Sequence, residues 1–411
     1  MSFKPIDKEI IKNLYKFRCL TDEQIIKLVG KHRTNMSDAV PPRLINNKLV
    51  YKEINTYSDN EEPVYFLTNR GIKKYCYMCN IPTSLINLNN SKIEKGYITE
   101  GGLKIKPQFL SHQIALNTFV IDLINKLKKE QPSKPHSYYH EKNSQIYEDI
   151  RPDGVFYFND ICYFLEMDMG TESEKQLNDK WENYRIFINK QQELTERKII
   201  VLFIVGEITH KEKRIDLIKK TVYEQVLPYL NPYLDIIVND MEGGIKTVVN
   251  LSSTEDNFEK KIEKIFNHKG FNVFIGNQTQ LNIHEDFEYM FFVQRKDKKV
   301  RFFVDKYIKN SFYSIYKAVY MHKQNLLLKK AGCKRKTPLM LIFNNIMEAS
   351  NEMKMLRMSG IELPETVFFT TELHLELFAR NEIEIHEVVF TFNAFDQQII
   401  FYDLNHMLSK L

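Results

Sequence analysis

Three carboxylates stand where two apolar runs begin or end in the sequence RPDGVFYFNDICYFLEMDMG, residues 151–170. Asp153 precedes the first run, and Glu166 and Asp168 close the second. Carboxylate oxygens are ligands that Mg²⁺ and Mn²⁺ prefer, so acids at neighbouring strand ends can form a metal site or a site directed at phosphate. The alternative is that they are solvated strand ends. The choice decides whether the chain is an enzyme.

The elements around these acids are predicted from the hydrophobic pattern. Residues 155–158 and 161–165 form two short strands, and Asn159-Asp160 between them predicts a tight β-hairpin. A helix is predicted over 109–129, which carries His112, and a strand over 136–146. A second helix is predicted over 172–192, preceded by Gly170 and a capping Thr171, and a strand covered on both faces over 199–205.

The N-terminal part of the chain is basic. Residues 1–110 hold 18 Lys and Arg against 11 Asp and Glu, whereas the rest holds 40 against 42, within a net charge of +5. A basic head on a near-neutral body is typical of a nucleic-acid-binding module. We therefore expect double-stranded DNA as the partner.

The pattern of this head predicts three short helices and a β-hairpin. The first helix covers 6–17, and the second follows a capping box of Thr21 and Gln24 and stops at Gly30. A third is expected over roughly 36–48, although Pro41-Pro42 interrupts it. Two strands then flank a polar turn at 58–62. This order predicts a winged helix-turn-helix.

Basic and polar side chains of the third segment and its flanks are the expected DNA contacts. We expect phosphate contacts from Lys31, Arg33, Arg43, Lys48 and Lys52, and base-edge contacts from Asn35, Ser37 and Arg43. A second backbone contact is expected from the densest basic cluster, which contains Lys334, Arg335 and Lys336. The alternatives are a protein-binding winged helix and a solvated loop. Cys76 and Cys79 are interpreted as helix residues, because structural zinc needs four ligands.

The C-terminal half is predicted to repeat the element order of the middle part. A helix is expected over 210–227, strands over 233–238 and 247–251 around a turn at 242–244, and an aromatic hairpin over 289–304. A helix over 308–328 and a buried strand over 338–343 follow. Glu166 falls in register with Asp305, which favours a diverged internal duplication. A C-terminal hairpin after residue 387 offers an edge for self-association.

The combination of an N-terminal winged helix, "LSHQIALN", "RPD" and "ExDxGTE" with a downstream Lys and Tyr resembles the replication-relaxation family of plasmid and conjugative-element proteins. The hairpin–helix–strand order also resembles the PD-(D/E)xK nuclease-like core. The fold class implied is a multidomain α+β and α/β protein. The expected domains are a winged helix at 1–85, a linker at 86–105, a nuclease-like domain at 106–265 and an α/β domain at 266–411. One interpretation of the last domain is a degenerate repeat of the preceding one.

The nuclease resemblance implies roles for the acids. Asp153 and Glu166 match the two metal ligands, but Asp168 takes the place of the lysine, which Lys180 or Lys175 of the next helix would have to supply. His112 and Asp149 could join the cluster. Because the strand lysine is missing, we expect a scaffold or dimerisation platform without a cofactor. The contrasting hypothesis is an endonuclease or nickase that uses Asp153, Glu166, Asp168 and Lys180 with Mg²⁺ or Mn²⁺.

Composition and absent motifs narrow the function further. No run of about 18 apolar residues predicts a membrane span, and five cysteines in a long chain favour a reducing cytoplasm. The chain lacks a P-loop and a His-x-His cluster, which argues against ATP-driven and relaxase chemistry. The leading hypothesis is a sequence-specific DNA-binding protein of a mobile genetic element, with a homo-oligomer as one expected form. A ligand- or peptide-responsive transcriptional regulator is a further alternative.

Overall fold

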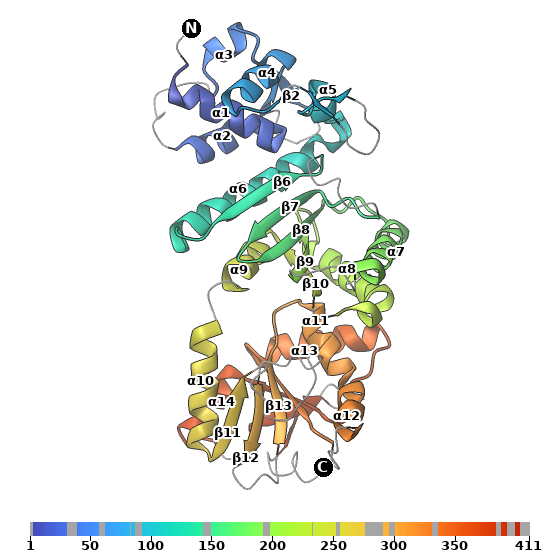
Figure 1. The fold of residues 1–411 in the computed structure, drawn as a ribbon. Helices are drawn as coiled ribbons and strands as arrows, with labels where there is room; N and C mark the ends of the chain where they lie inside the picture. The colour runs from blue at the N-terminus through green and yellow to red at the C-terminus, as the bar shows by residue number, and fades with distance from the viewer. Residues whose placement is uncertain are drawn as a thin grey trace. The chain divides into compact units, whose positions relative to one another are not determined.

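A computed structural model gives the fold (Figure 1). It describes residues 3–30, 39–56, 62–82, 84–86, 93–142, 149–191, 198–231, 233–251, 255–275, 291–295, 301–330, 336–383, 388–392 and 399–402. The chain divides into two compact units. The first contains Met1–Thr171 and Ile204–Ile208, and the second contains Glu172–Phe203 and Thr209–Leu411. The protein is mixed α and β, as predicted.

The N-terminal module of the first unit alternates helices with a three-stranded antiparallel sheet of order β1-β3-β2. Its elements in chain order are α1 (Pro5–Phe17), β1 (Cys19–Thr21), α2 (Asp22–Val29), α3 (Pro42–Asn46), β2 (Val50–Asn55), β3 (Glu62–Leu67) and α4 (Asn69–Met78). Buried side chains of α1 and β3 supply much of its core. Cys76 is buried on α4, as the helix interpretation predicted.

Local chemistry explains where these helices begin and end. The Thr21–Gln24 capping box is present, and Gly30 ends α2 with a φ of +82°, so both predicted signals are confirmed. The third helix is shorter than predicted. It starts only at Pro42, because a proline is tolerated in the first turn but not inside a helix. The earlier part of the predicted helix, up to residue 38, lies outside the described residues.

The stretch predicted as a linker contains short elements. They are β4 (Leu85–Ile86), β5 (Ile93–Glu94) and α5 (Glu100–Leu103), and a 3₁₀ turn, η1 (Pro107–Phe109), follows. Leu103 and Ile105 are buried, and the Tyr15 hydroxyl accepts the Ile98 N–H at 3.0 Å. The C-terminal part of this stretch therefore packs against the N-terminal module.

A long helix and three antiparallel strands complete the main part of the first unit: α6 (Leu110–Glu130), β6 (His136–His140), β7 (Gly154–Phe158) and β8 (Ile161–Asp168). Asn159 and Asp160 join β7 to β8 with φ values of +49° and +58°, the conformation of a type I′ turn. The predicted hairpin is confirmed. The part of the predicted strand between 143 and 146 lies outside the described residues.

The following elements are α7 (Glu174–Gln191), β9 (Lys198–Val205), α8 (Lys211–Gln225), η2 (Leu227–Tyr229), β10 (Leu234–Asp240) and α9 (Met241–Leu251), and the sheet order is β10-β9-β8-β7-β6. The first turn of α7 is capped by Ser173 and not by Thr171. The predicted strand at 247–251 is wrong. Asp240 accepts the Gly243 N–H and starts a helix, which buries Val248 and Val249 on one face.

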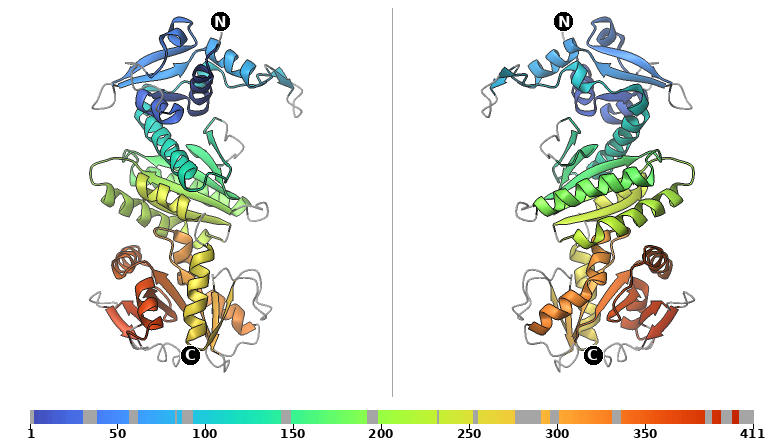
Figure 2. Two further views of the ribbon diagram at one scale, coloured as in Figure 1. Left: turned by 90° about the vertical axis from the view of Figure 1, so that its left-hand side faces the viewer. Right: turned by 90° about the vertical axis from the view of Figure 1, so that its right-hand side faces the viewer.

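The C-terminal part is built on a seven-stranded sheet of order β11-β12-β13-β14-β15-β16-β17. Its elements are α10 (Glu255–His268), β11 (Phe271–Ile275), β12 (Phe291–Arg295), β13 (Arg301–Lys306), α11 (Phe312–Val319), α12 (Met321–Lys330), β14 (Leu339–Phe343), α13 (Ile346–Met358), β15 (Val367–Thr371), α14 (Glu372–Ala379), β16 (Val389–Phe392) and β17 (Ile399–Tyr402). Figure 2 shows α10 along this sheet, where Ile262 and Phe266 join its core.

The same order of elements occurs twice along the chain. One helix and three antiparallel strands are followed by helix, strand, helix, strand and helix, first from α6 to α9 and then from α10 to α14. Gly154, the first residue of β7, pairs with Leu165, and Phe291, the first residue of β12, pairs with Val304. Glu166 comes directly after Leu165 and Asp305 directly after Val304, so the two acids occupy equivalent positions in the two hairpins. This supports the predicted duplication. The helix predicted over 308–328 is divided at Tyr320 into α11 and α12.

No helix in the described part of the chain combines the length and the apolar character that crossing a membrane requires.

Candidate functional site

Most of the predicted DNA-contacting residues of the N-terminal module lie at its surface or outside the described residues. Lys52 is exposed on β2, and Lys48 occupies the turn before β2 with a φ of +54°. Four lie outside the described residues: Lys31, Arg33, Asn35 and Ser37. Of the second cluster, Lys336 is exposed, whereas Lys334 and Arg335 also lie outside the described residues.

Arg43 is tied to α1. Its Nε and Nη2 donate to Asp7 Oδ2 and Oδ1 at 2.9 and 2.6 Å, a two-pronged ion pair with a carboxylate that is only 2% exposed. Asp7 also accepts the Lys4 N–H at the start of α1. These hydrogen bonds to Asp7 raise the pKa of Arg43. The arginine expected to read bases therefore holds α3 against α1.

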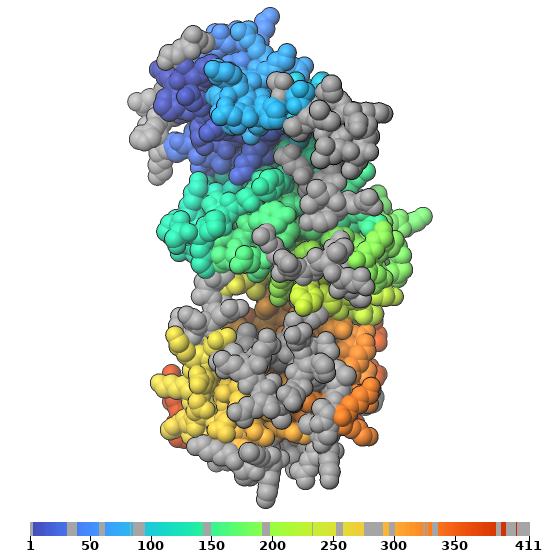
Figure 3. All heavy atoms as spheres, viewed as in Figure 1, coloured from blue at the N-terminus to red at the C-terminus, as the bar shows by residue number. Residues whose placement is uncertain are grey.

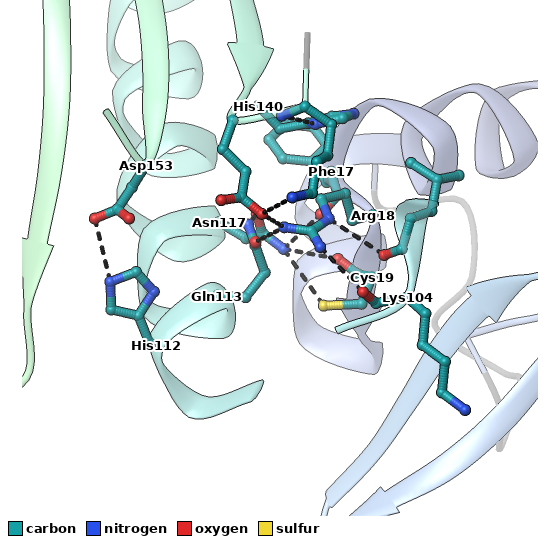
Figure 4. A network of polar contacts seen from close by, with 12 residues as sticks. Phe17, Arg18, Cys19, Lys104, His112, Gln113, Asn117, His140 and Asp153 are labelled. Carbon is teal, nitrogen blue, oxygen red and sulfur yellow. Dashed lines mark hydrogen bonds and ion pairs between the residues drawn. The ribbon is translucent and has the colours of Figure 1, made fainter. Parts of the chain in front are cut away.

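A buried arginine that the sequence did not single out connects the module to α6. Arg18 follows α1 with a φ of +69°, and its guanidinium donates to Gln113 Oε1 at 3.1 Å and to Glu141 Oε1 at 2.6 Å (Figure 4). It also donates to the Leu103 and Lys104 carbonyls. These bonds orient the module relative to α6 and the end of β6.

Asn117 of α6 adds to the same network. Its amide donates to the Phe17 and Cys19 carbonyls at 3.2 and 2.7 Å and its Oδ1 accepts from Gln113 (Figure 4). Asn117 is fully buried. Two carbonyls that flank the strained Arg18 residue are thus satisfied by one side chain of α6.

The structure brings together two of the predicted carboxylate-site residues, His112 and Asp153. His112 Nε2 lies 3.2 Å from Asp153 Oδ2 (Figure 4). It also lies 2.9 Å from the Met167 carbonyl oxygen. Asp153 Oδ2 also accepts the Met167 N–H at 2.8 Å. Asp153 and His112 are therefore fixed to the backbone between Glu166 and Asp168. A helix, the start of β7 and the end of β8 meet here.

Glu166 and Asp168 are strand residues with buried side chains, 3% and 1% exposed. They are not solvated strand ends. The Asp168 carbonyl accepts the Gly206 N–H at 2.9 Å. Among the described residues, no three or more His, Cys, Asp or Glu side chains are grouped so that they could hold a metal ion. As they are placed, these side chains do not form a complete metal site, and metal binding by Asp153 and Glu166 stays a prediction.

Tyr138 of β6 is a residue of this region that sequence reasoning missed. A Cβ on Gly154 would meet its ring at 2.7 Å, so the glycine after Asp153 is required for the ring to pack there. Burial and then the charge of Asp153 raise the pKa of Tyr138 well above its ordinary value. Its buried hydroxyl has no hydrogen-bond partner among the described residues. The Asp-Gly dipeptide was the available signal.

Lys180, the predicted substitute for the strand lysine, has its own partner in the second unit. Its Nζ lies 3.0 Å from Glu172 Oε1 and 5.1 Å from the centre of the Phe203 ring. Lys175, the other candidate, is exposed on α7. The catalytic role of either lysine stays a prediction.

Comparison with known proteins adds one result to this geometry. The family model described as replication-relaxation matches residues 11–202, which contain most of the N-terminal module, α6 and the Asp153 region. This part of the chain is similar to the replication-relaxation family. The match confirms the resemblance found in the sequence motifs. No curated protein and no solved structure gives a significant match.

Proposed function

We propose that this protein binds double-stranded DNA in the replication or relaxation of a plasmid or another mobile element. The match to the replication-relaxation family supports the process, and the basic charge of the first 110 residues supports the partner. The replication-relaxation match includes the module that we propose as the DNA-binding part.

The observation that carries this proposal is the element order of the module. The order helix, strand, helix, helix, strand and strand, with sheet order β1-β3-β2, supports the interpretation as a winged helix-turn-helix. In that motif the third helix enters the major groove. Here α3 and the residues before it would do so, and Lys31, Arg33, Asn35 and Ser37 would supply contacts. Lys48 and Lys52 would contact phosphates beside the groove.

The α/β parts would then serve as a scaffold or as a platform for self-association. The nuclease-like core remains the proposed fold for α6 to α9, and a degenerate repeat for α10 to α14. In the second series Lys317 of α11 forms an ion pair with Asp305, the counterpart of Glu166. An acid already neutralised by a lysine is suited to a structural role.

The test uses the full-length chain and a library of random duplexes. We expect enrichment of one sequence, and a loss of preference for it in the Lys31→Ala/Arg33→Ala/Asn35→Ala variant. Lys260→Ala/Lys264→Ala, two exposed lysines of α10, is the control and should bind like the wild type. Absence of any preferred sequence, or equal losses in both variants, would contradict the proposal.

A metal-dependent endonuclease is the second candidate. The observation that favours it is the placement of His112 and Asp153 against the backbone between the buried Glu166 and Asp168. Mn²⁺-dependent nicking of a supercoiled plasmid, lost in Asp153→Asn and in Glu166→Gln, would support it. Nicking that survives in both variants would point to a contaminant. Titration calorimetry with Mn²⁺ gives an independent measure of metal binding.

A further inference from the structure

Four lysines recur at every fourth position along α1 and its N-cap. Lys4, Lys8, Lys12 and Lys16 lie on one side of the helix, where a spacing of four residues corresponds to a rise of about 6 Å. The first three are exposed and Lys16 is partly buried. We call Lys4, Lys8, Lys12 and Lys16 the lysine stripe. None of them belongs to the predicted recognition segment.

The lysine stripe is not paired with acids among the described residues. No described residue forms an ion pair with any of its four lysines, whereas Lys27 contacts Glu23 and Asp122, and Lys126 contacts Glu130. Glu9 is the one exposed acid of α1; it accepts from the Asn13 amide, and its negative charge acts on Lys16 without forming an ion pair. The positive charge of the stripe is therefore only partly offset within the described part of the unit.

The lysine stripe also opposes the stability of its own helix. Like charges four residues apart repel each other, and cations near a helix N-terminus interact unfavourably with the helix dipole. Lys4 and Lys8 lie at that end of α1. A polyanion bound along the helix would reduce both the repulsion between the lysines and their unfavourable interaction with the helix dipole. The arrangement is therefore suited to binding a polyanion.

The positive charge continues from α1 onto α6, beside His136 of β6. Burial and then the charge of Lys128 lower the pKa of Lys16, and burial followed by the charge of Lys16 lowers the pKa of His136. Lys128 is exposed in the last turn of α6. These effects place Lys16, Lys128 and His136 close together, so the positive region is longer than α1 alone.

Lys12 and Lys16, the C-terminal half of the lysine stripe, face away from α3. Successive helix residues are separated by about 100°, so Lys16 lies roughly opposite Asp7 and Lys12 about 140° from it, whereas Lys8 and Lys4 lie about 100° and 60° from it. Asp7 is the residue that binds Arg43 of α3. Tyr15 of α1 stacks on Tyr75 of α4 with ring centroids 4.0 Å apart, and both helices reach the surface of the unit (Figure 3). A duplex in front of α3 would therefore not lie along Lys12 and Lys16.

We propose that the lysine stripe and Lys128 form a second DNA-binding surface, which holds the phosphate backbone of a duplex without reading its sequence. This inference rests on the proposed DNA-binding function and adds a separate surface to it. A row of cations at intervals of about 6 Å fits a repeating phosphate chain better than a single small anion. Lysine acts there as a point charge.

The experiment measures how the affinity for a 30-bp duplex of arbitrary sequence depends on salt. Each phosphate contact contributes about 0.9 to the slope of log K against log salt. We expect Lys8→Gln/Lys12→Gln/Lys16→Gln to lower the magnitude of that slope by about 2 to 3. The matched control is Lys260→Gln/Lys264→Gln/Lys354→Gln, three exposed lysines of α10 and α13 with the same charge change. It should leave the slope unchanged.

The outcomes separate this inference from the proposed function. A smaller slope in the lysine-stripe variant, with an unchanged ratio of affinities for the selected and the arbitrary duplex, supports the second surface. A wild-type slope in that variant, or equal changes in the control, overturns it and leaves the winged-helix proposal standing. A wild-type protein that binds no duplex overturns both. The unfolding temperature of the variant should be equal to or above that of the wild type, because repulsion within α1 is relieved.

Discussion

Arg43 and Asp7 form a two-pronged ion pair, with the guanidinium on α3 and the carboxylate at the first turn of α1. The contact links a five-residue helix, which has little stability by itself, to the core of the N-terminal module. An Arg43 substitution is therefore expected to lower the stability of the module, in addition to the predicted loss of DNA contacts.

We predict that Asp7→Ala and Arg43→Ala each lower the free energy of unfolding by about 1–3 kcal/mol, because each removes charged hydrogen bonds. The double variant should lose less than the sum, since one interaction is removed twice. Urea unfolding of the four proteins measures the coupling. Strictly additive losses would show that the ion pair does not stabilise α3.

The stability of the protein should depend on pH through His140. Burial, and then the charges of Arg18 and Lys142, lower the pKa of His140 to about 3. In an unfolded chain the same group titrates near pH 6.5. As pH falls below that value, the unfolded state takes up a proton that the folded state refuses. The free energy of unfolding therefore decreases as the pH falls below about 6.5.

The expected loss from His140 is about 2 kcal/mol between pH 6.5 and pH 5. His140→Asn keeps an acceptor near the position of Nδ1, which accepts the Lys142 N–H, but it cannot titrate. Its unfolding free energy should therefore fall less than that of the wild type over this range. Parallel curves for the two proteins would contradict the assignment.

Glu352, a buried carboxylate in the second unit, should contribute more to stability than an exposed acid. Lys219 Nζ lies 2.7 Å from Glu352 Oε2, and the hydroxyls of Tyr223 and Tyr307 also donate to Glu352. Burial would raise the pKa of Glu352, but Lys219 and the two hydroxyls hold it below the ordinary value. The network joins α8 to α13.

We expect Glu352→Leu to cost about 3–5 kcal/mol, because Lys219 then stays buried without a counter-charge. Lys219→Met/Glu352→Leu should recover much of that loss. Lys354→Leu, an exposed change on the same helix, is the control. Chemical denaturation followed by circular dichroism measures all three. A double variant as unstable as Glu352→Leu would mean that the charge pair is not the cause.

The single tryptophan reports the packing of α7 on α8. Trp181 is fully buried, and its Nε1–H donates to Thr221 Oγ1 at 2.8 Å. We expect Thr221→Val to keep the shape of the site but leave that donor unsatisfied, at a cost of about 1–3 kcal/mol. Native fluorescence should stay blue-shifted while the midpoint of its unfolding curve moves to lower urea. An unchanged midpoint would show that the bond contributes nothing net.

Features set by neighbouring residues were predictable from the sequence. The β7–β8 hairpin follows from Asn159-Asp160, two residues that tolerate positive φ, and the start of α2 follows from Thr21 and Gln24. The pattern failed at α9, where Gly-Gly and paired valines indicated a turn and a strand. The Asp240 side chain caps this segment and one face of it is buried, and both effects stabilise a helix.

Features set by distant residues were not predictable. Arg18 has partners 85 to 123 positions away, and nothing near it distinguishes it from a surface arginine. The sequence placed Asp153, Glu166 and His112 in one region, and the contact between His112 and Asp153 agrees with that. It gave no signal that Arg43 would meet Asp7, because that contact depends on how α3 packs on α1.

The Arg18 network sets where the chain can be cut. A fragment that ends near residue 85 would lose every recorded acceptor of the Arg18 guanidinium, as well as the Asn117 amide that satisfies the Phe17 and Cys19 carbonyls. It would carry an uncompensated cation and bare carbonyls on a newly uncovered apolar surface. A soluble DNA-binding fragment should therefore extend through α6 and the end of β6, at least to Glu141.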